Sequence, residues 1–232
     1  MTRAEQERAL REVYGVVATL SRKDGKTVLR LRHKQLQKDL VLRSYPERAP
    51  VYEYLKGIRA TGLPAVYDVI PCEDGWVILE EWIEGNSLAT LLEGGLFPYR
   101  GARVVLLDLC EALNALHRAG FVHRDVKPAN VIVQKNGRAV LVDQETGRMA
   151  KESPDTHRLG TTGYAAPEQY VGASLPQSDV YALGVLLNLM LTGRHPSEKL
   201  PKNARAKRII QRATAMNPED RYSDAAGFAE AL

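Results

Sequence analysis

The spacing of apolar residues changes once along the chain, and this change limits the fold more than any other feature. Across about residues 13–79 the apolar residues stand in short β-branched runs, among them YGVVATL, TVLRLRH, DLVLRSY and WVILEEW. Such runs between turn residues are typical of strands. From Tyr99 onward apolar residues recur every three or four positions, as in GARVVLLDLCEALNALHRAG, which predicts helices. An α+β chain with a small strand-rich lobe and a larger helical lobe is the simplest architecture.

One helix is expected inside the strand-rich part. Pro50 suits a first helical turn, and VYEYLKGIRA carries Val51, Leu55 and Ile58 at helical spacing before a break at residues 62–64. The two lobes join near residues 81–85. We therefore expect domains at 1–84 and 85–232.

The composition is that of a folded protein rather than of a disordered one, with 44% hydrophobic and 26% charged residues. Much of the net charge of +4 comes from PKNARAKRIIQR at residues 201–212. Because no aromatic residues interleave these cations, a solvated helix face is favoured over nucleic-acid binding. No nucleic-acid partner is expected.

The cysteines and the longest apolar run indicate a cellular setting. Cys72 and Cys110 are isolated, without the spacing of a zinc site or the density of a disulfide scaffold, which suits a reducing compartment. The run ALGVLLNLMLTG is shorter than the ~20 residues of a membrane span. We expect a cytoplasmic location with no span in this chain, and the cytosolic domain of a longer membrane protein stays an open alternative.

A predicted hairpin brings two oxygen ligands together. In VIVQKNGRAVLV, two β-branched runs flank Asn136 and Gly137, a strong hairpin signal. The start of one strand of an antiparallel hairpin lies beside the end of the other, so Asn130 and Asp143 are expected at the same open end. Amide and carboxylate oxygens of this kind suit Mg²⁺.

Four motifs in order give the chain its resemblance to a known family. HRDVKPAN at residues 123–130 and GTTGYAAPEQY at residues 160–170 are followed by SDVYALGVLLNLMLTG and NPEDRYS. The ordered set resembles the protein kinase domain of the eukaryotic-like Ser/Thr type, as found in bacteria. This resemblance implies the two-lobed kinase fold, in which Asp179 anchors the catalytic loop and Arg221 pairs with Glu168.

The resemblance also implies catalytic roles. Asp125 would accept or orient the proton of the substrate hydroxyl, and Lys127 would neutralise charge on the transferred phosphoryl group. Asn130 and Asp143 would hold Mg²⁺, and ATP would be the phosphoryl donor. The protein substrate is not identified.

Two further implied roles concern the activation segment, which in the family lies between Asp143 and the A-P-E triplet at residues 166–168. Arg124 would meet a phosphorylated residue, for which Thr156 is a candidate, although an unmodified surface threonine is about as well supported. Thr161 would brace Asp125.

The nucleotide side departs from the family pattern. The implied nucleotide-binding residues are Arg43, Glu53, Glu81 and Ile83. The turn SRKDGKT has one glycine where the family has several, so a solvated hairpin turn is favoured there over a phosphate cradle. Arg43 stands where the family has lysine, and Glu80 stands at a normally apolar position. A buried carboxylate needs a partner, so we expect Glu80 or Glu53 to pair with Arg43.

The residues after Asp143 also depart from the family, because Gln144 and Glu145 replace Phe and Gly. Glutamine cannot switch packing as phenylalanine does, and glutamate lacks the backbone freedom of glycine, so Asp143 is expected to be fixed. Three functions stay open. An ATP-dependent Ser/Thr protein kinase is favoured, a pseudokinase scaffold is the main alternative, and a small-molecule phosphotransferase is opposed by the A-P-E triplet at residues 166–168.

Overall fold

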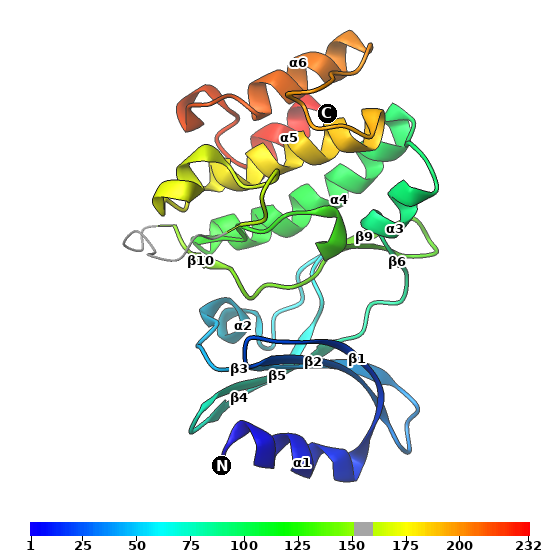
Figure 1. Cartoon of the computed structure of the whole chain (residues 1–232), viewed down its shortest axis with the longest axis vertical. Helices are drawn as coiled ribbons and strands as arrows, with labels where there is room; N and C mark the ends of the chain where they lie inside the picture. Colours follow the sequence, from blue (N-terminus) through cyan, green and yellow to red (C-terminus); the bar gives the residue numbers. More distant parts are fainter. Residues whose placement is uncertain (151–159) are drawn as a thin grey trace. The chain divides into compact units, whose positions relative to one another are not determined.

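The computed structural model describes residues 1–150 and 160–232 and contains two compact units (Figure 1). The first unit comprises Met1–Arg59 and Pro64–Ile83, and the second comprises Ala60–Leu63 and Glu84–Leu232. The short piece 60–63 joins the second unit because the N–H of Leu141 donates to the carbonyl of Gly62 at 2.8 Å. A Cβ on Gly62 would lie 2.9 Å from the carbonyl oxygen of Asp108, so glycine permits this close approach.

The first unit is built on a five-stranded antiparallel sheet with strand order β1-β2-β3-β5-β4. The strands are β1 (Tyr14–Lys23), β2 (Lys26–His33), β3 (Asp39–Tyr45), β4 (Val66–Cys72) and β5 (Gly75–Glu81). Alternation along β3 places Leu40 and Leu42 on one face, in a cluster with residues of β2 and β5, and Arg43 and Tyr45 on the other. The expected strand-rich lobe is confirmed.

Two helices pack on opposite faces of this sheet (Figure 1). Helix α1 (Arg3–Val13) was not expected from the sequence; it begins with a capping box between Thr2 and Glu5 and places Leu10 against the leucine cluster. Helix α2 (Pro50–Leu55) packs on the other face, where the rings of Tyr45 and Tyr52 lie 6.3 Å apart.

The helix expected over residues 50–60 is shorter than predicted. It ends at Leu55, and Ile58 remains exposed. The backbone of Gly57 has a φ of +77°, which no α-helix accommodates. The apolar spacing that included Ile58 was therefore misleading.

The second unit is mainly helical, as predicted. Its helices are α3 (Leu88–Glu93), α4 (Tyr99–Arg118), α5 (Pro176–Thr192), α6 (Ala204–Ala213) and α7 (Ala225–Ala231). Helix α5 is buried on nearly all sides and contacts α4, α6 and α7 (Figure 1). Helix α6 turns Ile209 and Ile210 inward and keeps most of its cations exposed, which agrees with the expected solvated face.

Short strands and 3₁₀ turns carry the motif residues of this unit. A three-stranded sheet has the order β6-β8-β9 and contains β6 (Asn86–Ser87), β8 (Val131–Val133) and β9 (Ala139–Leu141). A second pair joins β7 (Phe121–Val122) to β10 (Arg148–Met149). The 3₁₀ turns are η1 (Pro128–Asn130), η2 (Pro167–Val171) and η3 (Pro218–Asp220). Strands β8 and β9 form the predicted hairpin, with Val131 opposite Leu141.

None of the helices in residues 1–150 and 160–232 combines the length and the apolar character needed to cross a bilayer.

The contact between α5 and α6 makes the first testable prediction. A Cβ on Gly184 would lie 2.7 Å from the Cβ of Ala213, whereas a Cβ on Gly101 in α4 would meet nothing closer than 3.6 Å. We expect Gly184→Ala to lower the free energy of unfolding by about 1–3 kcal/mol through overpacking. Gly101→Ala should be neutral or stabilise by up to about 1 kcal/mol, because alanine favours helix. Urea unfolding measures both, and equal effects of the two substitutions would contradict the proposed close packing.

Candidate catalytic site

The carboxylate of Asp125 is the centre of a small hydrogen-bond network in the second unit. Its Oδ2 accepts from the Lys127 ammonium at 2.6 Å and from Asn130 Nδ2 at 3.0 Å. Its Oδ1 accepts from the Thr161 hydroxyl at 2.7 Å, and Lys127 also donates to that hydroxyl oxygen at 2.9 Å. Thr161 therefore braces Asp125, in the contact expected of it. Asp125, Lys127 and Asn130 lie in HRDVKPAN at residues 123–130, which corresponds to the catalytic loop of the resemblance and is called so below, and Thr161 lies in the segment before η2.

The backbone before Asp125 is strained and is held by a buried carboxylate. Arg124 has a φ of +73°, a conformation that costs of order 1–3 kcal/mol for a residue other than glycine. Asp179, at the start of α5, accepts from the backbone N–H of His123 at 2.9 Å and of Arg124 at 2.8 Å. His117 Nε2 lies 2.9 Å from the same carboxylate. Asp179 thus holds the backbone of this loop, in the contact that the family resemblance implied.

Electrostatics favour the ionised form of this buried anchor. Burial raises the pKa of Asp179, but hydrogen bonds from His117 and from the N–H of Arg124 outweigh it, so the pKa lies below its ordinary value of 3.8. Burial lowers the pKa of His123, although the carboxylates of Asp179, Asp125 and Asp143 act in the opposite direction. Burial is the larger effect, so the neutral form of this buried imidazole is favoured.

Asn130 and Asp143 lie at the open end of the β8–β9 hairpin. The N–H of Val142 donates to the carbonyl of Asn130 at 2.8 Å, which extends the hydrogen bonding between β8 and β9 by one residue. Asp143 is the next residue after Val142. Asn130 Nδ2 donates to the Asp125 carbonyl at 2.9 Å, so the amide oxygen is the end of that side chain left for another ligand. Asp143 itself has a φ of +68°, the second strained residue of the site.

The segment after Asp143 is tied to the body of the second unit. Gln144 is buried and donates from Nε2 to the carbonyl of Leu141 at 2.9 Å. Two residues later, Thr146 donates to the carbonyl of His123 at 2.8 Å. The sequence correctly pointed to Gln144 as the unusual residue but missed that its amide bonds back to β9.

A bidentate ion pair between Arg221 and Glu168 holds the A-P-E triplet at residues 166–168. Arg221 donates to Glu168 from Nη1 at 2.7 Å and from Nη2 at 2.9 Å, and it also donates to three backbone carbonyls. Ser178 donates to the same carboxylate at 2.7 Å. The predicted pairing of Arg221 with Glu168 is confirmed.

The catalytic-loop arginine is bound into the same framework through its backbone. The carbonyl of Arg124 accepts from Gln169 Nε2 at 2.9 Å, and Gln169 Oε1 accepts from the N–H of Ala166 at 2.9 Å. Gln169 thus joins the catalytic loop to η2, a link that no motif indicated. Thr156, the expected phosphorylation partner of Arg124, lies outside the described residues.

In the first unit, Arg43 pairs with Glu80 rather than with Glu53. Arg43 Nε donates to Glu80 Oε1 at 2.5 Å and Nη1 donates to the Tyr45 hydroxyl at 3.1 Å, and both members of the ion pair are buried. Of the two partners expected for Arg43, Glu80 is therefore confirmed. Glu53 is the wrong one, because its carboxylate accepts from Arg48 at 2.5 Å on the surface. The early end of α2 leaves Glu53 in a helix of only 6 residues.

The other expected nucleotide-binding residues lie at the end of β5. The Glu81 carboxylate accepts from the N–H of Ala65 at 3.1 Å, and Ile83 is buried. The turn SRKDGKT, for which a solvated hairpin was favoured over a phosphate cradle, is a tight hairpin in which Lys23 lies opposite Lys26 across Asp24 and Gly25. Arg3 of α1 donates to the carbonyl of Gly25 at 2.9 Å and holds this turn.

Comparison with known proteins agrees with this geometry. Residues 14–228 match the family model described as protein kinase domain. The chain is 38% identical over 192 residues to the serine/threonine-protein kinase PknL of Mycobacterium tuberculosis. The aligned region covers 70% of this chain and 48% of PknL. It is 28% identical over 218 residues to the serine/threonine-protein kinase PknA of a Nostoc species, covering 83% of this chain and 38% of PknA. The chain spans less than half the length of these relatives.

The buried pair in the first unit can be tested by removing one partner or both. Glu80→Gln leaves the Arg43 guanidinium buried without its counter-charge, so we expect a loss of about 3–5 kcal/mol in the free energy of unfolding. The double change of Arg43→Met with Glu80→Leu should recover most of that loss, because no charge is then buried. Urea unfolding of the single and double variants checks this. An additive, larger loss in the double variant would contradict a coupled ion pair.

The Glu168 site predicts a pH dependence of stability. Burial raises the pKa of Glu168, but hydrogen bonds from Arg221 and Ser178 outweigh it and hold the pKa below the ordinary value of 4.5. A carboxyl whose pKa is lowered by folding stabilises the fold above its unfolded pKa, and this contribution disappears as the pH falls through the folded pKa. Glu168→Gln should therefore be less stable than the wild type at pH 7, and the difference should shrink below about pH 4.5. A difference that stays constant over this range, measured by urea unfolding, would contradict the assignment.

Proposed function

The chain belongs to the protein kinase domain family, and on that premise we propose that it transfers the γ-phosphoryl group of ATP to a serine or threonine hydroxyl of a protein. The observation that carries this proposal is the hydrogen-bonded carboxylate of Asp125. It accepts one bond on Oδ1, from Thr161, and two on Oδ2, from Lys127 and Asn130. An ionised carboxylate offers about four acceptor positions, so one position on Oδ1 stays available for a substrate hydroxyl.

In this proposal Asp125 orients the hydroxyl and accepts its proton as the hydroxyl oxygen bonds to the γ-phosphorus of ATP, while the bond from that phosphorus to the oxygen of the leaving ADP breaks. Lys127 is the nearest cation, with its Nζ 2.6 Å from Asp125 Oδ2 and a quarter of its side chain exposed. Its charge would offset the charge of the transferred phosphoryl group. Thr161 holds the carboxylate so that the remaining acceptor position of Oδ1 meets the substrate hydroxyl.

The hairpin end fits Mg²⁺. The amide of Asn130 commits its N–H₂ to Asp125, which leaves an amide oxygen, and Asp143 follows with a carboxylate. Two oxygen ligands are what Mg²⁺ takes from a protein when phosphates and waters complete its shell. When bound there, Mg²⁺ would neutralise charge on the ATP phosphates. We assign the two ligands to Asn130 and Asp143.

For the nucleotide we propose Arg43, Glu81 and Ile83, and we leave Glu53 out because Arg48 already holds its carboxylate. Arg43 carries the charge that a lysine supplies elsewhere in the family. Its buried pair with Glu80 sets its guanidinium in place, since the fork is bonded to Glu80 and Tyr45 together.

A second function, a scaffold of kinase fold without catalysis, is favoured by one observation. The guanidinium of Arg43 is engaged with Glu80 and the turn over residues 23–26 is a tight hairpin, so phosphate would have to compete with existing contacts. A thermal shift with ATP and Mg²⁺ separates the two functions, because a ligand that binds only the folded state raises the melting temperature.

The proposed catalysis is tested by phosphate transfer from labelled ATP in the presence of Mg²⁺. Asp125→Asn removes the base, so we expect transfer to fall by about 10²–10⁴-fold. Asp143→Asn removes a metal ligand and should abolish most transfer while raising the Mg²⁺ concentration needed for the remainder. Asp220→Asn, at an exposed carboxylate outside the network, is the matched control and should keep wild-type activity. Wild-type protein that shows neither transfer nor an ATP-induced thermal shift would assign the chain to the scaffold function.

A further inference from the structure

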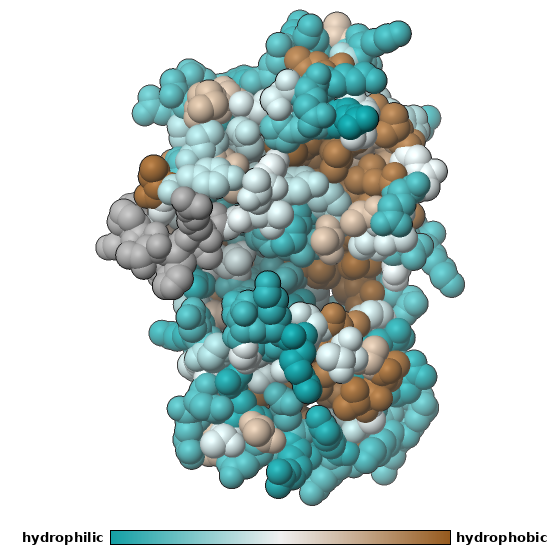
Figure 2. Space-filling model, in the orientation of Figure 1, coloured by the Kyte–Doolittle hydropathy of each residue, from teal (hydrophilic) through white to brown (hydrophobic). Residues whose placement is uncertain are grey.

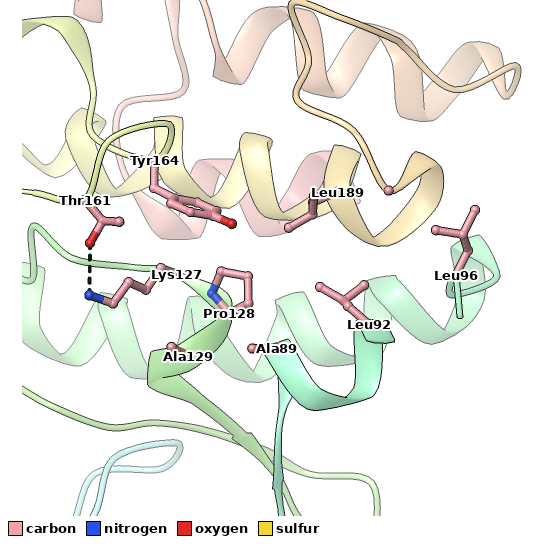
Figure 3. Close-up of a pocket in the computed structure, with 10 residues that line it drawn as sticks. Ala89, Leu92, Leu96, Lys127, Pro128, Ala129, Thr161, Tyr164 and Leu189 are labelled. Atoms are coloured by element: carbon pink, nitrogen blue, oxygen red, sulfur yellow. Dashed lines mark hydrogen bonds between the residues drawn. The ribbon is translucent and has the colours of Figure 1, made fainter. Parts of the chain in front are cut away.

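A groove of about 510 Å³ lies in the second unit beside the Asp125 network. One wall comes from α3 and the residues after it, with Leu92 and Leu96, and the opposite wall comes from α5, with Leu189 (Figure 3). Pro128 and Ala129 form the floor between the walls, and the ring of Tyr164 lies over the α5 side (Figure 3). Figure 2 shows the apolar surface that gathers over α3 and the neighbouring end of α5. We call this feature the leucine groove.

The walls of the leucine groove are fixed without any ligand. The N–H of Phe97 donates to the carbonyl of Met190 at 2.8 Å, which fastens the chain after α3 to α5. Buried Asn188 donates from Nδ2 to the carbonyls of Arg194 at 2.7 Å and Lys199 at 2.9 Å. The loop after α5 is therefore held in place, and the groove is a formed site that an incoming side chain can fill.

The groove is continuous with the catalytic network. Lys127 and Thr161 line it and are hydrogen-bonded to each other (Figure 3). The same two side chains donate to Asp125 at 2.6 Å and 2.7 Å. An extended polypeptide advances about 3.3 Å per residue. A chain that presents a hydroxyl to Asp125 therefore places a side chain a few residues away in the groove.

The charges of the lining decide which side chain fits. No acidic residue is among the described residues that line the groove, and its one cation is Lys127. An arginine or lysine of a substrate would lose hydration there without finding a counter-charge. A leucine or isoleucine would bury its side chain against Leu92, Leu96 and Leu189.

We propose that the leucine groove selects protein substrates that carry a large aliphatic side chain within a few residues of the acceptor hydroxyl, and that it discriminates against basic residues there. This inference rests on the proposed kinase function for its role but not for its test. The specificity-determining residues are Leu92, Leu96, Leu189 and Ala129. The occupant is a segment of another protein, bound by contact with the apolar walls.

The test begins with binding, which needs no catalysis. Short fluorescent peptides with alanine in place of the acceptor serine carry leucine, arginine or aspartate at each flanking position in turn. We expect leucine at one position to tighten binding about tenfold or more over arginine at that position, which is the contribution of one well-buried leucine. Equal affinities for all peptides would overturn the proposal.

Two groove variants and one control sharpen the result. Leu96→Asp places a charge on an exposed wall residue and should remove the preference for leucine. Ala129→Glu puts a carboxylate on the floor, so the preference should reverse toward arginine. Val104→Asp changes a residue of α4 that is exposed to a similar degree, 49% against 57% for Leu96, and should leave the preference unchanged. Loss of the preference in Val104→Asp, or its survival in both groove variants, would contradict the assignment.

Phosphate transfer to the matching serine peptides separates this inference from the proposed function. A leucine preference in binding, with no transfer to any peptide, would support the groove and refute the kinase activity. Transfer at equal kcat/KM for leucine and arginine peptides would support the activity and refute the groove. Analytical sedimentation of the same proteins tests whether a second copy of the chain occupies the groove instead. A wild-type dimer that Leu96→Asp dissociates, together with no peptide preference, would assign the groove to that second copy and overturn the proposal.

Discussion

The carboxylate of Asp179 is the interaction on which the rest of the site depends. It lies near the start of α5 and accepts the backbone N–H groups of His123 and Arg124, the two residues before Asp125. Arg124 needs this support because its left-handed backbone is unfavourable. The pKa of Asp179 is held low by the hydrogen bonds that outweigh its burial, so the anchor stays charged at neutral pH. The orientation of Asp125 is thus determined by a residue more than 50 positions later in the chain.

A second set of contacts extends this framework to the activation motif. Gln169 bonds the carbonyl of Arg124, and Glu168 beside it is held by Arg221 and Ser178. Gln169, Ser178 and Arg221 are buried, and their bonds tie the segment that follows Thr161 to the catalytic loop and to α5. The first unit contains a different buried ion pair. There Arg43 pairs with Glu80 of the neighbouring strand, because the carboxylate of α2, Glu53, is bound by Arg48 instead.

Much of this arrangement follows from local sequence patterns. The hairpin at residues 131–141 was predictable because β-branched runs flank Asn136 and Gly137, and it brings Asp143 beside Asn130 with no tertiary information. The pairing of Arg221 with Glu168 was implied by the family resemblance alone, because the two residues lie 53 positions apart and no local pattern joins them.

The missed features depend on contacts that leave no local pattern. Helix α1 has no fully buried residue, so its hydrophobic signal is weak, and the sheet holds it mainly through Leu10 and Arg3. The bond of His117 with Asp179 spans 62 residues. The bond of Gln144 to the carbonyl of Leu141 depends on how the chain turns after β9, which the sequence pattern does not show. The prediction for helix α2 was too long, because Ile58 fits the helical spacing although the backbone of Gly57 is not helical.

The central claim is that Asp179 holds the catalytic loop in its strained conformation. Amide hydrogen exchange of a peptide spanning residues 121–126 tests it most directly, in the wild type and in Asp179→Asn. The account predicts slow exchange at His123 and Arg124 in the wild type, and much faster exchange there in the variant while the β8–β9 hairpin and the sheet of the first unit keep their protection. Unchanged protection of His123 and Arg124 in Asp179→Asn would contradict it.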